Sequence, residues 1–235
     1  KLERIECDAF SSTSLTGTVL LPEGLKYVSG FRDTKITNVQ FPSTLEEISY
    51  RAFEGCGSLM CEISLPHSLK RIEGRAFLSS AIKGNLALPE GLEYIGENAF
   101  CHCSGLTGSL TIPSGVHIIY SYAFSDCGFT GNLTLPMGLT ESQSDAFRDT
   151  KFKGELNIPS TVTIIEHGAF WDTEFNGTLI LPKELIVLGY AAFYGCASLT
   201  SIKIPNSVTE FEVSWGYSSV FAGCSNLTSI TIPES

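Results

Sequence analysis

Positive charge is scarce in this sequence. Its 235 residues include 15 lysines and arginines but 25 aspartates and glutamates, which gives a formal net charge of −10 at pH 7. So few and such dispersed cations cannot neutralise a row of phosphates. The composition therefore argues against nucleic acid as a partner, and against electrostatic attachment to an anionic membrane.

Long apolar runs are also absent. The longest nearly apolar stretch, residues 185–194, is far shorter than the roughly 18 residues that a membrane span requires. No linker, low-complexity segment or block of like charge interrupts the chain, and 43% of its residues are apolar while only 17% are charged. We therefore expect one well-packed domain over residues 1–235, with no membrane insertion by this segment.

The common signals of catalysis are missing as well. The sequence has no His-Glu-x-x-His, no glycine-rich phosphate loop and no serine on a nucleophile elbow. Its carboxylates are numerous but scattered over outward positions, as on an ordinary solvated surface. We predict that the protein is not an enzyme and that it uses no cofactor and no metal.

What the sequence does have is a repeat of about 23 residues. Every proline closes a short apolar strand, and a phenylalanine precedes each proline by 11 to 13 residues. A period of this size is typical of stacked coils that bury a continuous core, rather than of a closed globule. The prolines are Pro22, Pro42, Pro66, Pro89, Pro113, Pro136, Pro159, Pro182, Pro205 and Pro233, and the phenylalanines are Phe10, Phe31, Phe53, Phe77, Phe100, Phe124, Phe147, Phe170, Phe193 and Phe221.

One unit shows how each coil is built. In residues 109–112 the alternation of a pleated strand turns Leu110 and Ile112 inward and Ser109 and Thr111 outward. The segment Ala-Phe-x-x-Cys is too short for a full helix and indicates a helical or irregular turn. Because such a turn is wider than a strand, we expect the turns on a convex side and a parallel sheet of Leu-x-Leu-Pro strands on a concave side.

The eight cysteines fit this repeat better than they fit a separate chemistry. Five of them, Cys56, Cys103, Cys127, Cys196 and Cys224, occupy a position that threonine or serine fills in other coils, which favours free buried thiols. Disulfides between Cys103 and Cys127 or between Cys196 and Cys224 stay open as an alternative, because each pair lies in adjacent coils. A zinc site at residues 101–103 with Cys127 is disfavoured, since neighbouring side chains diverge and Cys-x-Cys is not the usual zinc spacing.

The repeat unit resembles that of the BspA-like leucine-rich repeats, a family of bacterial and protist surface proteins. Residues 92–103 (LEYIGENAFCHC) and 199–205 (LTSIKIP) match its consensus closely, and the resemblance covers the whole chain. It implies an α/β, β-rich repeat solenoid of about ten right-handed coils. It also implies an exported protein, extracellular, on the cell surface or secreted, that serves in adhesion or protein binding, but it names no ligand.

Several units depart from the consensus. Many carry an extra residue in Thr-Gly-x-Leu-x-Leu-Pro, the second unit is shortened before Phe31, and Ser142 replaces an apolar residue. The interval from Phe193 to Phe221 is 28 residues long, and we expect its surplus at 212–218 to loop out. Because the chain begins and ends inside a repeat and shows no signal peptide, we interpret it as a fragment of a larger exported protein.

Two surfaces are candidate binding sites. One is the outward face of the Leu-x-Leu-Pro strands, although polar residues there also serve simply to keep a sheet soluble. The other is a group of aromatic residues near the C-terminal end, which could instead pack over the solenoid's end or edge. The first comprises Asn85, Ser109, Asn132, Glu155 and Thr178 in one row and Ala87, Thr111, Thr134, Asn157 and Ile180 in the next; the second comprises Trp171, Tyr190, Tyr194, Trp215 and Tyr217.

Two functions follow from these surfaces. The leading hypothesis is a non-enzymatic adhesion or protein-interaction module that binds a surface or matrix protein of a host or neighbouring cell. The alternative is a carbohydrate-binding module whose exposed aromatic rings stack on the sugar rings of a glycan.

Overall fold

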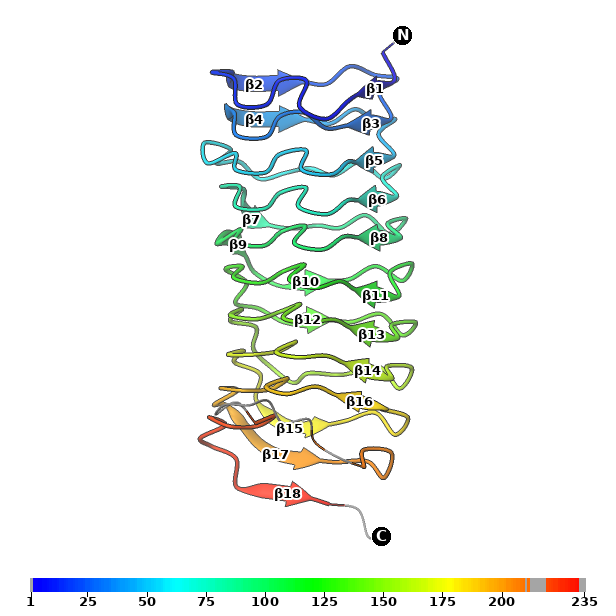
Figure 1. Ribbon diagram of the computed structural model, residues 1–235, viewed down its shortest axis with the longest axis vertical. Helices are drawn as coiled ribbons and strands as arrows, with labels where there is room; N and C mark the ends of the chain where they lie inside the picture. The colour runs from blue at the N-terminus through cyan, green and yellow to red at the C-terminus, as the bar shows by residue number, and fades with distance from the viewer. Residues whose placement is uncertain (1, 210, 212–218, 233–235) are drawn as a thin grey trace.

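The computed structural model describes residues 2–209, 211 and 219–232, which form a column of stacked coils. The first and last described residues lie at opposite ends of the column (Figure 1). All strand pairs in the described residues are parallel, because each coil returns the chain to the same side one level further along. We number the coils by their conserved phenylalanine, so that coil 1 contains Phe10 and coil 5 contains Phe100.

The first row of strands precedes the prolines, as the sequence predicts. Leu110 pairs with Leu133 and Thr111 with Thr134, so that inward leucines and outward threonines stand above one another. Proline follows all of these strands except β7 and β9 within two residues, and it cannot extend them because it has no N–H to donate to the ladder. The strands of this row are β2 (Thr16–Leu20), β4 (Lys35–Gln40), β7 (Lys83–Asn85), β9 (Gly105–Thr107), β10 (Leu110–Thr111), β12 (Leu133–Thr134), β15 (Gly177–Ile180), β17 (Leu199–Lys203) and β18 (Ser229–Thr231).

A second row of two-residue strands follows the prolines, and the sequence analysis did not predict it as strands. These strands run down the right-hand side of Figure 1 and form two parallel sheets, β1-β3-β5-β6-β8 and β11-β13-β14-β16. All except β1 contribute one buried residue, which is apolar, as Ile95 and Ile165 are, in every strand but β13, where it is Ser142. They are β1 (Arg4–Ile5), β3 (Tyr27–Val28), β5 (Glu47–Ile48), β6 (Arg71–Ile72), β8 (Tyr94–Ile95), β11 (Ile118–Ile119), β13 (Glu141–Ser142), β14 (Ile164–Ile165) and β16 (Val187–Leu188).

The conserved phenylalanines form a spine through the core. Their rings stack from Phe10 to Phe221, with centroid separations between 5.2 and 5.7 Å in successive coils. A second, shorter stack of Phe129, Phe152 and Phe175 meets this spine edge to face. Each such aromatic pair contributes about 0.5 to 1.5 kcal/mol beyond the burial of its area, so the spine stabilises the stacking itself.

The turn around each phenylalanine is irregular, and none of the described residues is helical. In coil 5 the residues two before and two after Phe100, Asn98 and His102, have positive φ angles of 56° and 61°. This conformation lets the N–H groups of residues 98, 100 and 102 donate to carbonyls of the next coil, at 2.9 to 3.0 Å. Inter-coil hydrogen bonds therefore continue through the turn, where a helix would direct them within one coil.

The small polar position after each phenylalanine caps the turn. Cys103 Sγ donates to the carbonyl of Phe77 in the preceding coil at 3.0 Å, whereas Thr150 Oγ1 donates to Phe147 of its own coil at 2.7 Å. All eight cysteines are free. Neither of the two disulfides left open by the sequence is present, because the inward thiols point at phenylalanine carbonyls.

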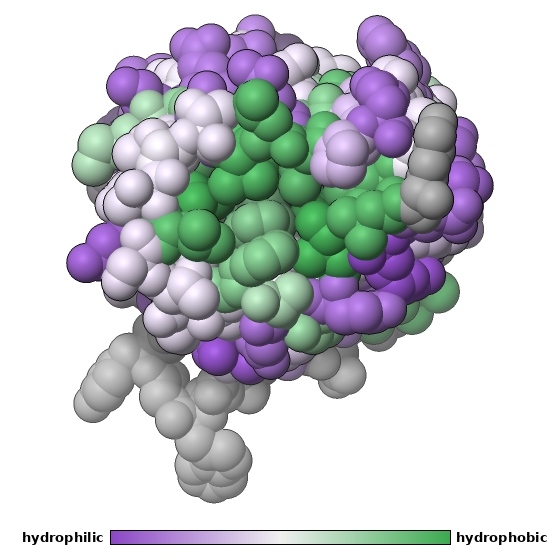
Figure 2. Space-filling model, turned by 90° about the horizontal axis from the view of Figure 1, so that it is seen from above, coloured by the Kyte–Doolittle hydropathy of each residue, from purple (hydrophilic) through white to green (hydrophobic). Residues whose placement is uncertain are grey.

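The N-terminal end of the column has no polar cap among the described residues. Figure 2 shows apolar side chains in the middle of this end, ringed by polar ones. Leu2 and Phe10 are 55% and 41% exposed, whereas Phe124 in the middle of the spine is fully buried. In repeat proteins such an end face is normally covered by a terminal repeat with a polar outer side.

Candidate functional site

The outward face of the segments before the prolines carries most of the predicted polar residues, although the segment that holds Glu155 and Asn157 is not a strand. Ser109, Thr111, Asn132, Thr134, Glu155 and Asn157 are exposed, while Thr178 is half-buried. Ala87 and Ile180 are exposed as well, and Ile180 adds an apolar side chain that is 58% exposed. The pleat thus presents a narrow polar face, as its two-residue alternation predicts.

This face is not one continuous ladder. In the pairing of β7 with β9, Asn85 lies opposite Thr107 rather than opposite Ser109, so the row predicted from Asn85 to Ser109 is interrupted. The cause is the extra residue of the Thr-Gly unit, because Gly108 adopts a φ of +77° between β9 and β10. After this glycine, β10 pairs with β12 of the following coil.

The interruption leaves a hollow between coils 4 and 5. It measures about 300 Å³, and its lining includes four residues of the predicted surface, Asn85, Ala87, Ser109 and Thr111. Leu86, Leu88 and Pro113 also line it, together with Glu90, so its lining is both apolar and polar. Its size and mixed lining suit a side chain of a bound protein better than a flat sheet would.

The described rings of the predicted aromatic group pack against neighbouring side chains. The ring centroid of Trp171 lies 4.5 Å from that of Tyr194 in the next coil. The guanidinium of Arg148, from the preceding coil, lies 4.5 Å from the Trp171 centroid. Because these neighbours come from the coils before and after, they cover the two faces of the indole, and its Nε1 donates to Asp172 at 2.9 Å. Tyr190 stacks on His167 at 4.3 Å.

Two aromatic residues of this predicted site, Trp215 and Tyr217, lie outside the described residues, as does the rest of the insertion at 212–218.

Arg148 is itself held by two carboxylates, since its Nε donates to Asp149 at 3.0 Å and its Nη1 to Asp145 at 3.3 Å. The group around Trp171 is therefore a network of internal contacts, and it offers no free ring face of Trp171 for a sugar.

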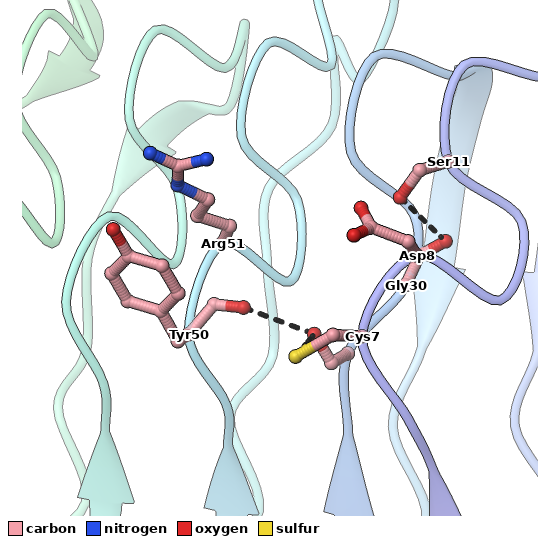
Figure 3. A pocket seen from close by; sticks show the side chains of 7 residues that line it. Cys7, Asp8, Ser11, Gly30, Tyr50 and Arg51 are labelled. Carbon is pink, nitrogen blue, oxygen red and sulfur yellow. Dashed lines mark hydrogen bonds between the residues drawn. The ribbon is translucent and has the colours of Figure 1, made fainter.

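The structure adds a cavity that the sequence analysis did not name. Only two residues separate Val28 from Phe31, whereas four separate Ile48 from Phe53 in the next coil. The missing residues leave a cavity of about 240 Å³ between coils 1 and 3. Figure 3 shows Cys7, Asp8 and Ser11 on one side of it and Tyr50 and Arg51 on the other, with Ser29 and Gly30 in the lining. The shortened unit before Phe31 was the signal from which it could have been found.

Backbone contacts shape this cavity. Ser29 Oγ donates to the carbonyl of Tyr50 at 3.0 Å, and Ser11 Oγ donates to the carbonyl of Gly30 at 3.4 Å. Gly30 stands where most coils have alanine, and a Cβ there would lie 2.6 Å from the carbonyl oxygen of Glu6. The shortened coil therefore depends on glycine to pass close to coil 1.

Comparison with known proteins agrees with this architecture. The family model described as the BspA-type leucine-rich repeat region matches residues 1–107, 28–153, 108–214 and 142–235, which together span the chain. The chain belongs to the BspA-type leucine-rich repeat family. The family and the β-rich solenoid predicted from the repeat are thereby confirmed, with irregular rather than helical turns.

Two solved structures share the fold of this BspA-type chain. A leucine-rich repeat protein from Bacteroides ovatus ATCC 8483 is 24% identical with a TM-score of 0.77, over 97% of this chain and 58% of its own. A leucine-rich cell surface protein from Faecalibacterium prausnitzii A2-165 is 20% identical with a TM-score of 0.56, over 99% of this chain and 77% of its own. The chain thus spans less than two thirds of the Bacteroides protein.

No curated protein matches the sequence significantly. No helix in the described part of the chain is long and apolar enough to cross a membrane.

Proposed function

We propose that this BspA-type chain is a non-enzymatic protein-interaction module that serves in adhesion, as part of a protein that is displayed on the cell surface or secreted. The observation that carries the proposal is the exposed polar face of the first row, with the hollow lined by Asn85, Ser109 and Thr111. A face of exposed threonine, serine and asparagine side chains offers hydrogen-bond donors and acceptors along the column. The partner is a surface or matrix protein of a host or neighbouring cell.

Surface display is supported by the family and by the Faecalibacterium structure, whose protein is described as a cell surface protein. The absence of catalytic motifs from the sequence supports a binding role. Binding of glycans through stacked aromatics is not favoured, because Arg148 and Tyr194 already occupy the two faces of Trp171.

The test is direct binding of the purified chain to a panel of extracellular-matrix proteins and to a glycan array. We expect binding to a protein of the panel and none to glycans. The double variant Thr111→Arg/Thr134→Arg should abolish it, because two long cations would cover the neighbouring strands β10 and β12.

A matched control places the same cation elsewhere. Ile186 is 73% exposed and lies beside the second row, so Ile186→Arg should fold and bind as the parent does. Binding that survives the double variant, or that Ile186→Arg removes, would place the interface on another face. Binding to glycans alone would support the carbohydrate alternative.

A further inference from the structure

One turn of the column brings together three side chains that bind metals. Cys101 and His102 follow Phe100 in coil 5, and Ser125 and Asp126 hold the equivalent positions after Phe124 in coil 6. The N–H of His102 donates to the carbonyl of Ser125 at 2.9 Å, which fixes the register of the two turns. His102 therefore lies directly beside Asp126.

The ligand atoms of these three residues are close enough to share one ion. The Cys101 sulfur, a His102 ring nitrogen and an Asp126 carboxylate oxygen all lie within 4.8 Å of one another. His102 Nδ1 is 3.5 Å from Asp126 Oδ2, and Ser125 Oγ donates to the same carboxylate oxygen at 2.8 Å. In metal sites, hydrogen bonds to a ligand from a neighbouring residue, such as the one from Ser125, hold that ligand in its orientation.

The turn backbone also holds the ligands in place. His102 and Asp126 both adopt positive φ, 61° and 56°, in the repeated turn conformation. Cys101 is 3% exposed, so its thiol approaches from the protein side, while His102 is exposed and Asp126 half-buried. A hollow of about 440 Å³ beside all three leaves room for a water molecule as a fourth ligand.

The neighbouring charges favour a cation at this point. Carboxylates outnumber guanidinium groups in the lining of the hollow, and Arg148 is paired with Asp145 and Asp149. The charged lining residues are Glu97, Asp126, Asp149, Arg75 and Arg148. A thiolate and a carboxylate together carry two negative charges, which a divalent ion neutralises. Sulfur and nitrogen ligands select zinc over magnesium or calcium, which take oxygen ligands.

We propose that Cys101, His102 and Asp126 bind a zinc ion, with water as the fourth ligand. On binding, the zinc–sulfur bond replaces the S–H bond and the thiol proton passes to solvent. The objection to a site at residues 101–103 holds for Cys103, whose thiol turns inward to Phe77. The objection does not apply to Asp126, because this residue lies in the next coil. Asp126 supplies the third ligand that residues 101–103 alone do not provide.

The site would tie coil 5 to coil 6 across the turn. It depends on coil 5, where alone a cysteine and a histidine follow the phenylalanine, whereas aspartate holds the position of Asp126 in coils 2, 7 and 8 as well. It is also independent of the polar face proposed to bind proteins, so either proposal can fail without the other.

The test is a cobalt titration of the metal-free chain. Co²⁺ should produce a thiolate-to-cobalt charge-transfer band in the near ultraviolet, and Zn²⁺ should displace it. Cys101→Ser should remove the band, and His102→Asn or Asp126→Asn should each weaken Co²⁺ binding by about tenfold or more. Asparagine is chosen because it tolerates the positive φ of both positions.

Matched controls leave the three ligands untouched. Cys7→Ser removes an exposed thiol, and Asp33→Asn removes the exposed carboxylate at the equivalent turn position of coil 2, so both should keep the band and the affinity. X-ray absorption of the zinc-loaded parent should show one sulfur ligand among nitrogen and oxygen ligands. The proposal is overturned by an absent band, by a band that survives Cys101→Ser, or by a zinc shell with no sulfur or with several.

Discussion

The phenyl rings of Phe124 and Phe147 lie 5.6 Å apart and only 3° from parallel, in the middle of a ten-ring spine. Phe124 is fully buried and also meets Phe129 edge to face at 6.3 Å. Phe124→Ala therefore removes several aromatic contacts at once and leaves a cavity that the stacked coils cannot close. We expect a loss of about 3 to 5 kcal/mol in the free energy of unfolding.

Urea unfolding followed by circular dichroism measures this loss. Met137→Ala is the control, because Met137 is 74% exposed and its truncation should change the midpoint little. An unchanged midpoint in Phe124→Ala would contradict the stacking of the spine at this coil.

Ser142 is the weak point of the second row of strands. It lies in register between Ile119 and Ile165, it is 2% exposed, and its Oγ has no hydrogen-bond partner. Ser142→Val removes a buried hydroxyl without a partner and adds apolar surface at a position that isoleucine fills in both neighbouring coils. We expect a gain of about 1 to 2 kcal/mol. A lower melting temperature would mean that the column is too narrow there for a branched side chain.

The fold was predictable because the same constraint recurs in every coil. A proline, an Ala-Phe pair and a small polar residue keep a common spacing, so that one interpretation has to satisfy many units at once. The second row was not predictable as strands, since two residues are too few to show an alternation.

The candidate sites were predictable only where they follow the repeat. The exposed polar face follows directly from the alternation of the first row. The covering of Trp171 depends on Arg148 and Tyr194, and the meeting of Cys101 and His102 with Asp126 depends on the register of two turns. Such contacts join residues about one repeat apart, and their geometry is set by the inter-coil hydrogen bonds of the turn.

Burial of the thiols makes the stability of the column sensitive to alkaline pH. Desolvation raises the pKa of the Cys196 thiol from about 9 to about 12. Above pH 9 the unfolded chain releases this proton while the folded chain keeps it, so the stabilisation present below pH 9 is lost as pH rises towards 12. One such thiol changes the free energy of unfolding by about 1.4 kcal/mol per pH unit.

Cys196→Thr isolates this contribution. Threonine already occupies the position in four coils, among them the preceding coil, where it is Thr173, so the variant should fold. Urea unfolding between pH 8 and 11 should give a shallower decline than in the parent, because one titrating thiol is gone. Parallel curves for the two proteins would show that Cys196 ionises as easily in the folded state as in the unfolded one.

Trp171 is expected to stabilise the turn column rather than to bind sugars. Trp171→Ala loses the contact with Arg148 and the contact with Tyr194, for a cost of about 1 to 2 kcal/mol. In a Trp215→Phe background, the fluorescence of Trp171 should not respond to soluble oligosaccharides. A saturable change in emission on adding a sugar would revive the glycan hypothesis.

The variants Gly30→Ala and Gly17→Ala distinguish two contributions to the loss of stability when a side chain is placed at positive φ, backbone strain and steric collision. Both have such angles, 87° and 78°, but a Cβ on Gly30 would lie 2.6 Å from the carbonyl oxygen of Glu6, while nothing lies within 4 Å of one on Gly17. Gly17→Ala should therefore cost only the backbone strain of about 1 to 2 kcal/mol.

Gly30→Ala adds the collision to that strain, and because the neighbouring atom belongs to the backbone it cannot move aside cheaply. Its loss in urea unfolding should exceed that of Gly17→Ala, and the displaced coil should change the rate at which the Cys7 thiol at the cavity reacts with an alkylating reagent. Equal losses for the two variants, with an unchanged Cys7 rate, would mean that coil 2 does not pass as close to coil 1 as the cavity requires.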